Sequence, residues 1–123
     1  MEDEKKLIIL VDNNPVYLFI WKKVLAKKYT IVTAPSAAKM FKFLENNRPF
    51  MILLDIDMPK MNGFEVIQIL KSKQETKNIP VIFLSSCPEA KFEWLYPALG
   101  AAGHIIKPFN PFALLNHVED LIT

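Results

Sequence analysis

Four polar side chains in this sequence could act together, because each one directly follows a short apolar run: Asp12, Asp55, Ser85 and Lys107. Runs of this kind are typical of strands buried on both faces of a parallel sheet. The carboxyl ends of such strands lie at one edge of the sheet, so we expect the four side chains to converge there. Two acids, a hydroxyl and an amine in one cleft are enough to do chemistry.

The stretch at 51–63 reads MILLDIDMPKMNG and carries the residue that we take as the functional carboxylate. Its first four residues are apolar, and Asp55 follows them directly. Asp57 comes two residues later, and the Met-Pro and Asn-Gly pairs behind it favour a turn before the next helix. In open α/β sheets, ligands and reactions are placed at such strand ends. Asp55 is therefore the first candidate for a reacting group.

The bulk composition is that of a globular domain. The chain has 123 residues, of which 51% are hydrophobic and 23% charged, and a net charge of +2. This length fits one domain with a sizeable core, and the small charge does not indicate nucleic-acid binding. A single cysteine, Cys87, rules out an internal disulfide framework and suits a reducing cytosol. Without a signal peptide or an apolar segment of roughly 18 residues, the sequence predicts a cytoplasmic protein.

The elements that must position these residues alternate regularly along the chain. Strands are predicted at 7–11, 29–34, 51–54, 81–84 and 104–106, with the second at a sheet edge. Helical patterns follow each strand, with short connections between the elements. The sequence therefore predicts an α/β fold, a doubly wound five-stranded parallel sheet with helices on both faces.

The bounds and the inward-facing residues of three helices can be predicted from the sequence. The first helix starts at Asn-Asn-Pro and runs to about Lys28. Leu18 and Phe19 lie off its apolar stripe, and we favour a place in a wide core face for both residues over an exposed docking surface. The fourth helix, from about residue 88, contains Pro97, which predicts a kink or an early end, with Gly100 or Gly103 as the stop. The last helix starts at Asn110 and is predicted to turn Leu114, Leu115, Val118 and Leu121 inward.

Over essentially its whole length the chain resembles the receiver domain of two-component response regulators, and is similar to the chemotaxis-type single-domain regulators. The match consists of V-D-N at 11–13, L-L-D-I-D-M-P-K-M-N-G at 53–63, S-S at 85–86 and K-P-F at 107–109. In this order and at these spacings the set is specific. The resemblance implies one receiver domain over 1–123, with the flavodoxin-like strand order 2-1-3-4-5. It also implies that a histidine kinase or a histidine phosphotransfer protein phosphorylates Asp55.

The resemblance assigns a role to each residue of the cluster. Asp55 would be the nucleophile that forms an aspartyl phosphate. Mg²⁺ would bridge the like charges, held by Asp12, Asp55 and the backbone carbonyl of Asp57. Lys107 and the Ser85 hydroxyl would contact phosphoryl oxygens. The domain would then be a regulatory phosphoacceptor rather than an enzyme, with only self-phosphorylation and self-dephosphorylation chemistry.

The sequence departs from the family pattern in three places. Asn13 stands where most receivers have a second acid, so we predict weaker Mg²⁺ binding. His104 occupies the aromatic switch position; a ring packed at the sheet edge and a rotameric switch are equally open, and a histidine there could make the output pH-sensitive. Asp57 and Cys87 occupy positions that in the family tune how long the phosphoryl group lasts.

The resemblance places the output on the face formed by the fourth helix, the fifth strand and the fifth helix, which would bind an effector or form a dimer. Trp94 and Tyr96 lie off the apolar stripe of the fourth helix, so a partner surface is a candidate role for both. We expect neither direct nucleic-acid binding nor membrane association. No effector segment follows Thr123, which fits either a single-domain regulator or the receiver of a longer chain.

Two other functions are open to this sequence. One is a pseudo-receiver, a phosphorylation-independent protein-binding module, which Asn13 supports and which Asp55, Ser85 and Lys107 oppose. The other is a small aspartate-nucleophile phosphatase of the haloacid dehalogenase type, which also uses an Asp-x-Asp after a buried strand. Its Asp pair normally lies near the start of the chain, and 123 residues leave no room for a cap domain.

Overall fold

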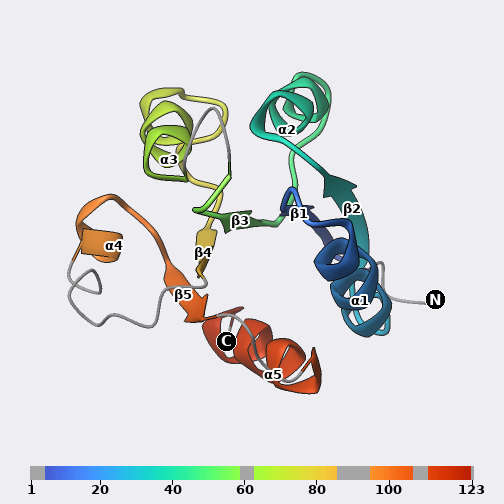
Figure 1. Cartoon of the computed structure of the whole chain (residues 1–123). Coiled ribbons are helices and arrows are strands. Elements are labelled where there is room, and N and C mark those ends of the chain that lie inside the picture. The colour runs from blue at the N-terminus through green and yellow to red at the C-terminus, as the bar shows by residue number, and fades with distance from the viewer. Residues whose placement is uncertain (1–4, 59–62, 86–94, 107–110, 123) are drawn as a thin grey trace.

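Five parallel strands form one sheet in the order β2-β1-β3-β4-β5, which confirms the predicted fold. The computed structural model describes residues 5–58, 63–85, 95–106 and 111–122. β2 lies at one edge of the sheet, as predicted, and β5 at the other (Figure 1). The strands are β1 (Leu7–Val11), β2 (Thr30–Ala34), β3 (Met51–Asp55), β4 (Val81–Ser85) and β5 (Gly103–Ile106).

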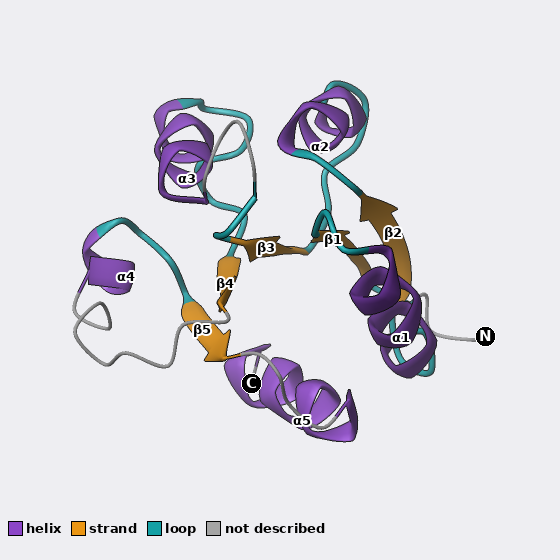
Figure 2. Cartoon of the chain, in the orientation of Figure 1, coloured by secondary structure: helices purple, strands orange, loops and turns teal. Residues whose placement is uncertain are grey.

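Helices cover both faces of the sheet (Figure 2). Buried side chains of α2, α3 and α4 form one core with one face, and those of α1 and α5 form a second core with the other. Every residue of β3 and β4 is buried, which explains why these strands are apolar throughout rather than alternating. The helices are α1 (Pro15–Leu25), α2 (Ala37–Leu44), α3 (Gly63–Ser72), α4 (Leu95–Ala98) and α5 (Pro111–Ile122).

α1 begins as the sequence predicts but ends earlier. The Asn14 side chain caps the helix by accepting a hydrogen bond from the backbone N–H of Val16, and Pro15 stands in the first turn. The helix ends at Leu25 rather than near Lys28, because the last turn tightens: the N–H of Lys28 donates to the Leu25 carbonyl at 3.1 Å.

The two residues off the stripe of α1 have different environments. Leu18 is partly buried and packs against the core, as we favoured. Phe19 is 64% exposed, and Val16 and Ile20 on the same helix are exposed as well. An apolar patch of Val16, Phe19 and Ile20 therefore lies on the outer side of α1, and the expectation of a core role is wrong for Phe19.

α4 includes Pro97 and ends at Ala98, before Gly100, which is one of the two predicted stops. Gly100 has φ of +94° and closes the helix in the left-handed conformation that glycine adopts without strain. Its N–H donates to the Pro97 carbonyl at 2.9 Å, and the N–H of Ala101 donates to the Tyr96 carbonyl at 3.0 Å. This pair of bonds is the Schellman motif, so Gly100 rather than Gly103 is the stop. Residues 88–94 of the predicted helix lie outside the described residues.

α5 packs beside α1 and β5. Val118 is fully buried and Leu115 partly buried, as predicted, but Leu121 is 40% exposed and so does not face inward. An ion pair of 2.9 Å joins Lys28 to Glu119 of α5. This hydrogen bond, and then the charge of Glu119, raise the pKa of Lys28. Within the described part of the chain, no helix has the length and apolar character to cross a membrane.

Candidate functional site

The strand register brings three of the predicted site residues to one edge of the sheet. Val11 pairs with Leu54, so Asp12 and Asp55 leave neighbouring strands at the same level. Asp55 in turn pairs with Leu84, which places Ser85 one residue further along β4. Lys107, the fourth predicted member, follows β5 in the sequence and lies outside the described residues.

The acids at this edge are buried. Asp12 is 0% exposed, Asp55 2% and Ser85 0%. Burying an ionised carboxylate is costly unless hydrogen bonds or a cation compensate the charge. Two buried carboxylates on adjacent strands supply the oxygen ligands that a hard divalent cation prefers. The residues present therefore fit Mg²⁺.

The two carboxylates are held in the same way. The backbone N–H of Asn14 donates to Oδ1 of Asp12 at 2.9 Å, and the backbone N–H of Asp57 donates to Oδ1 of Asp55 at 3.0 Å. Each bond spans two residues and fixes one carboxylate oxygen as the chain leaves the strand. The sequence analysis did not assign this role to Asn14. The shared spacing, a residue two positions after each acid at a strand end, could have indicated it.

The loop after β3 is positioned by close packing against α3. The N–H of Gly63 donates to the Ile56 carbonyl at 3.3 Å. A Cβ atom on Gly63 would lie 2.6 Å from Cγ2 and 2.8 Å from Cα of Ile56. Only glycine permits this approach, which sets the path of the backbone through Asp57. The Asp57 side chain itself is exposed, which suits a residue used through its backbone.

Of the acidic side chains that the structure describes, two are buried at this edge, Asp12 and Asp55. Asn13 is exposed and adds no charge. Among residues 5–58, 63–85, 95–106 and 111–122, no three His, Cys, Asp or Glu side chains gather in a group that could hold a metal ion. A cation here therefore depends on Asp12, Asp55 and oxygens that are not acidic side chains.

His104 contacts the ring of Tyr96, a residue for which the sequence predicts a surface position. Tyr96 is 3% exposed, and its ring centroid lies 4.8 Å from that of His104 and 5.3 Å from that of Phe83. The prediction that Tyr96 forms a partner surface is therefore wrong: this ring is buried in the core against β4 and β5. Trp94, the other candidate, and Cys87 lie outside the described residues.

The model of the response regulator receiver domain family matches residues 8–119. The chain belongs to this family. The receiver match covers all five strands except the first residue of β1, together with both acids of the buried pair, so the resemblance inferred from the four motifs is confirmed.

Proteins and structures similar to this receiver domain come from several signalling systems. It is 37% identical over 111 residues to a probable cyclic di-GMP phosphodiesterase of Vibrio cholerae, covering 89% of this chain and 25% of that protein. It is 27% identical over 121 residues to the sensor histidine kinase TmoS of Ectopseudomonas mendocina, covering 98% of this chain and 12% of that protein. The chain thus spans a quarter or less of these two relatives.

Two solved structures show the same fold. The chemotaxis response regulator CheY4 of Vibrio cholerae has a TM-score of 0.88 at 24% identity, with coverage of 95% of this chain and 98% of that chain. A CheY-like receiver domain protein from Methanospirillum hungatei has a TM-score of 0.84 at 26% identity, with coverage of 97% and 95%.

These similarities fix the broad function of the receiver domain. Its role is phosphorelay signalling, and neither the phosphorylation-independent binding module nor the phosphatase is favoured. Receiver domains are regulatory rather than catalytic; they generally bind Mg²⁺ at an acidic pocket and pair with histidine kinases and downstream effectors. The phosphodiesterase among the relatives is a longer protein, of which this chain matches one part.

Proposed function

We propose that Asp55 accepts a phosphoryl group from a phosphohistidine of a histidine kinase or histidine phosphotransfer protein. The observation that carries this proposal is the buried carboxylate of Asp55 at the end of β3, next to that of Asp12 and fixed by the N–H of Asp57. A carboxylate held in one orientation reaches an incoming phosphorus atom without a search among rotamers. The family match over 8–119 supports treating 1–123 as one receiver domain.

The transfer exchanges one bond for another. A carboxylate oxygen of Asp55 donates an electron pair to phosphorus and forms the new O–P bond, while the N–P bond of the phosphohistidine breaks. The histidine nitrogen keeps the electron pair of the broken bond and later takes a proton from water. The Ser85 hydroxyl donates a hydrogen bond to a phosphoryl oxygen, and the Lys107 ammonium neutralises another. Hydrolysis later returns Asp55 to a free carboxylate.

A divalent cation fits this edge of the sheet. Asp12, Asp55 and the carbonyl of Asp57 would hold Mg²⁺, which when bound neutralises the charge shared by carboxylate and phosphoryl oxygens. Asn13 contributes an amide oxygen rather than a carboxylate, so it is a weak or substituted ligand. Asp57 and Cys87, two residues beyond Asp55 and Ser85, tune the lifetime of the phosphoryl group.

Incubation with acetyl phosphate and Mg²⁺, followed by intact-mass measurement, tests the proposed reaction. We expect one phosphoryl adduct per chain, and none when EDTA removes the metal, because the buried acids otherwise repel the anionic donor. The absence of any adduct over a wide range of Mg²⁺ concentrations would contradict the proposal and favour the binding-module alternative.

Asn13→Asp is expected to strengthen Mg²⁺ binding. The variant adds a negative charge next to Asp12, and charge count sets the affinity of oxygen-ligand sites. We expect the Mg²⁺ concentration for half-maximal phosphorylation to fall by about tenfold, roughly 1.4 kcal/mol of binding free energy. Asn14→Asp would not serve as a control because Asn14 caps α1. The matched control is Asn46→Asp at an exposed position, which should leave the Mg²⁺ concentration for half-maximal phosphorylation unchanged.

The phosphodonor protein must dock around the buried Asp55, and α1 starts beside that edge. The exposed apolar patch of Val16, Phe19 and Ile20 faces outward from this helix, with Lys23 near the Phe19 ring at 5.5 Å. α1 contains two lysines and no acidic residue. We infer that a helix with an apolar stripe and acidic flanks packs on this patch.

Phe19→Ala is expected to slow phosphoryl transfer from the protein donor by about tenfold, because an aromatic anchor at an interface contributes roughly 1–2 kcal/mol. Phosphorylation by acetyl phosphate should stay unchanged, since this small donor needs no docking surface. Ile106→Ala, at an exposed apolar residue of β5, is the control. Equal loss with both donors would mean that Phe19 acts through the fold rather than through docking.

We place the output on the face of α4, β5 and α5, where phosphorylation would bias an effector contact or a self-dimer. His104 is the switch residue of this face, and its contact with Tyr96 links β5 to α4. Trp94 is a candidate contact residue. The domain acts in the cytoplasm without direct binding to nucleic acid or membrane, consistent with its small net charge of +2.

A further inference from the structure

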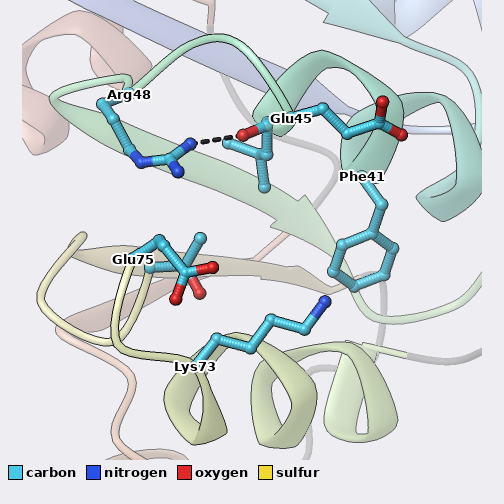
Figure 3. Close-up of a pocket in the computed structure, with 7 residues that line it drawn as sticks. Phe41, Glu45, Arg48, Lys73 and Glu75 are labelled. Carbon is cyan, nitrogen blue, oxygen red and sulfur yellow. Dashed lines mark hydrogen bonds between the residues drawn. The ribbon is translucent and has the colours of Figure 1, made fainter.

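A cavity of about 370 Å³ opens between the end of α2 and the loop that follows α3 (Figure 3). This loop leads into β4, so the cavity lies at the amino-terminal edge of the sheet, opposite Asp55. Phe41 and Leu44 provide an apolar wall, and buried Thr76 lines it from the loop. The volume is in the range of small-molecule sites, which runs from about 300 to 1,000 Å³.

Four charged residues surround this cavity, two of each sign. Glu45 is the C-cap residue of α2 and Arg48 lies in the loop that follows this helix, whereas Lys73 and Glu75 come from the loop after α3. In Figure 3 the acidic and basic groups alternate around the opening. Among the described residues, an ion pair within 4 Å joins Lys28 to Glu119, and none of the four cavity residues forms such a pair.

The basic groups are already oriented by the protein. Nη1 of Arg48 donates to the carbonyls of Leu44 and Asn47, the latter at 2.8 Å, so the guanidinium caps the end of α2. Nζ of Lys73 lies 5.5 Å from the centre of the Phe41 ring. This separation is a cation–π contact, which holds the ammonium over the apolar wall.

The loop on the other side of the cavity is also fixed. The Thr76 hydroxyl donates to the Leu70 carbonyl at 2.6 Å. The Lys71 ammonium donates to the carbonyls of Lys77 and Ile79, at 2.9 and 3.1 Å, and partial burial lowers its pKa. The cavity therefore exists before any ligand arrives, which reduces the ordering cost of binding.

We propose that this cavity binds a zwitterionic small molecule, a free α-amino acid with an apolar side chain. Its carboxylate would contact Lys73, its ammonium would contact the neighbouring Glu75, and its side chain would cover the Phe41 ring. A ligand with a single charge would meet two like charges across the opening, whereas a zwitterion satisfies both signs. This site is independent of phosphorylation at Asp55.

Titration of the unphosphorylated ¹⁵N-labelled chain with L-leucine tests the proposal by NMR. We expect the amide signals of residues 45–48 and 73–77 to shift and saturate, with a dissociation constant on the order of 1–10 mM for so small a ligand. N-acetyl-leucine and leucinamide each remove one charge and should bind at least about tenfold more weakly. No saturable shift with L-leucine, or equal shifts with all three compounds, would overturn the proposal.

Two exposed-site variants separate specific binding from general charge effects. Lys73→Gln and Glu75→Gln should each raise the dissociation constant by about tenfold or more. Lys77→Gln makes the same charge change as Lys73→Gln, on the same loop but outside the cavity lining, and should leave the dissociation constant unchanged. If Lys77→Gln weakens binding as much as Lys73→Gln does, the cavity is not the site. Because the chain is unphosphorylated, failure here leaves the assignment of Asp55 untouched.

Discussion

Asp55→Asn is expected to acquire no phosphoryl group from acetyl phosphate under conditions in which the parent chain acquires one. The amide nitrogen and oxygen of asparagine share their electrons by resonance, so the side chain is no longer a nucleophile towards phosphorus. The loss should be complete in the intact-mass spectrum, because Asp55 is the proposed nucleophile and the other buried acid, Asp12, is proposed to hold the metal. This is the largest effect that we predict.

Asp57→Asn is the matched control for this experiment. Asp57 lies two residues away, its carboxylate is exposed, and its structural contribution is the backbone N–H, which asparagine retains. We expect one adduct on Asp57→Asn, with a changed lifetime. Circular dichroism should show that Asp55→Asn is folded, since the variant removes one of two neighbouring buried charges without changing size. An adduct that persists on folded Asp55→Asn would refute the assignment.

Gly63→Ala is expected to lower the free energy of unfolding by about 1–3 kcal/mol and to slow phosphorylation. The added methyl group would lie 2.6 Å from Cγ2 and 2.8 Å from Cα of Ile56, so the backbone of the β3–α3 loop must move. This cost exceeds the roughly 0.5–1 kcal/mol that alanine gains over glycine in a helix. Because the same loop carries Asp57, whose N–H fixes Asp55, the movement should disturb the acid as well.

Gly103→Ala is the control for the packing effect. A Cβ atom there would lie 2.9 Å from the methyl groups of Leu121, which are the ends of a flexible side chain that is 40% exposed. Leu121 can turn away, so we expect a change of about 0.5 kcal/mol or less in chemical denaturation. If both variants unfold at the same denaturant concentration as the parent chain, then the contact between Gly63 and Ile56 does not constrain the loop.

The first helix shows how far sequence reasoning reaches. Asn14 and Pro15 mark the start of α1 because capping and a fixed φ are local effects of neighbouring residues. The end at Leu25 was predicted three residues too late, because lysines fit a helix or a turn equally well. The exposure of Phe19 was also missed: periodicity gives the direction of a side chain on a helix but not what lies opposite it.

Tyr96 shows the same limit on the other side of the sheet. Its place off the apolar stripe of the predicted fourth helix indicated a surface residue, but the side chain is 3% exposed. Periodicity along one helix does not say which other elements close over a side chain. The ring lies against Phe83 and His104, a contact between residues of three elements that no local pattern contains.

The sequence by itself determined the order of the elements, the strands that are buried on both faces, and the acids that end β1 and β3. These are local properties, because an apolar run followed by a polar residue marks a strand end wherever the strand lies. Only the tertiary structure decided that Asp12 and Asp55 are buried side by side, that Gly63 must touch Ile56, and that opposite charges from α2 and the α3–β4 loop meet at one cavity. Each depends on distances between segments far apart in the chain, and those distances are set by how the whole core packs.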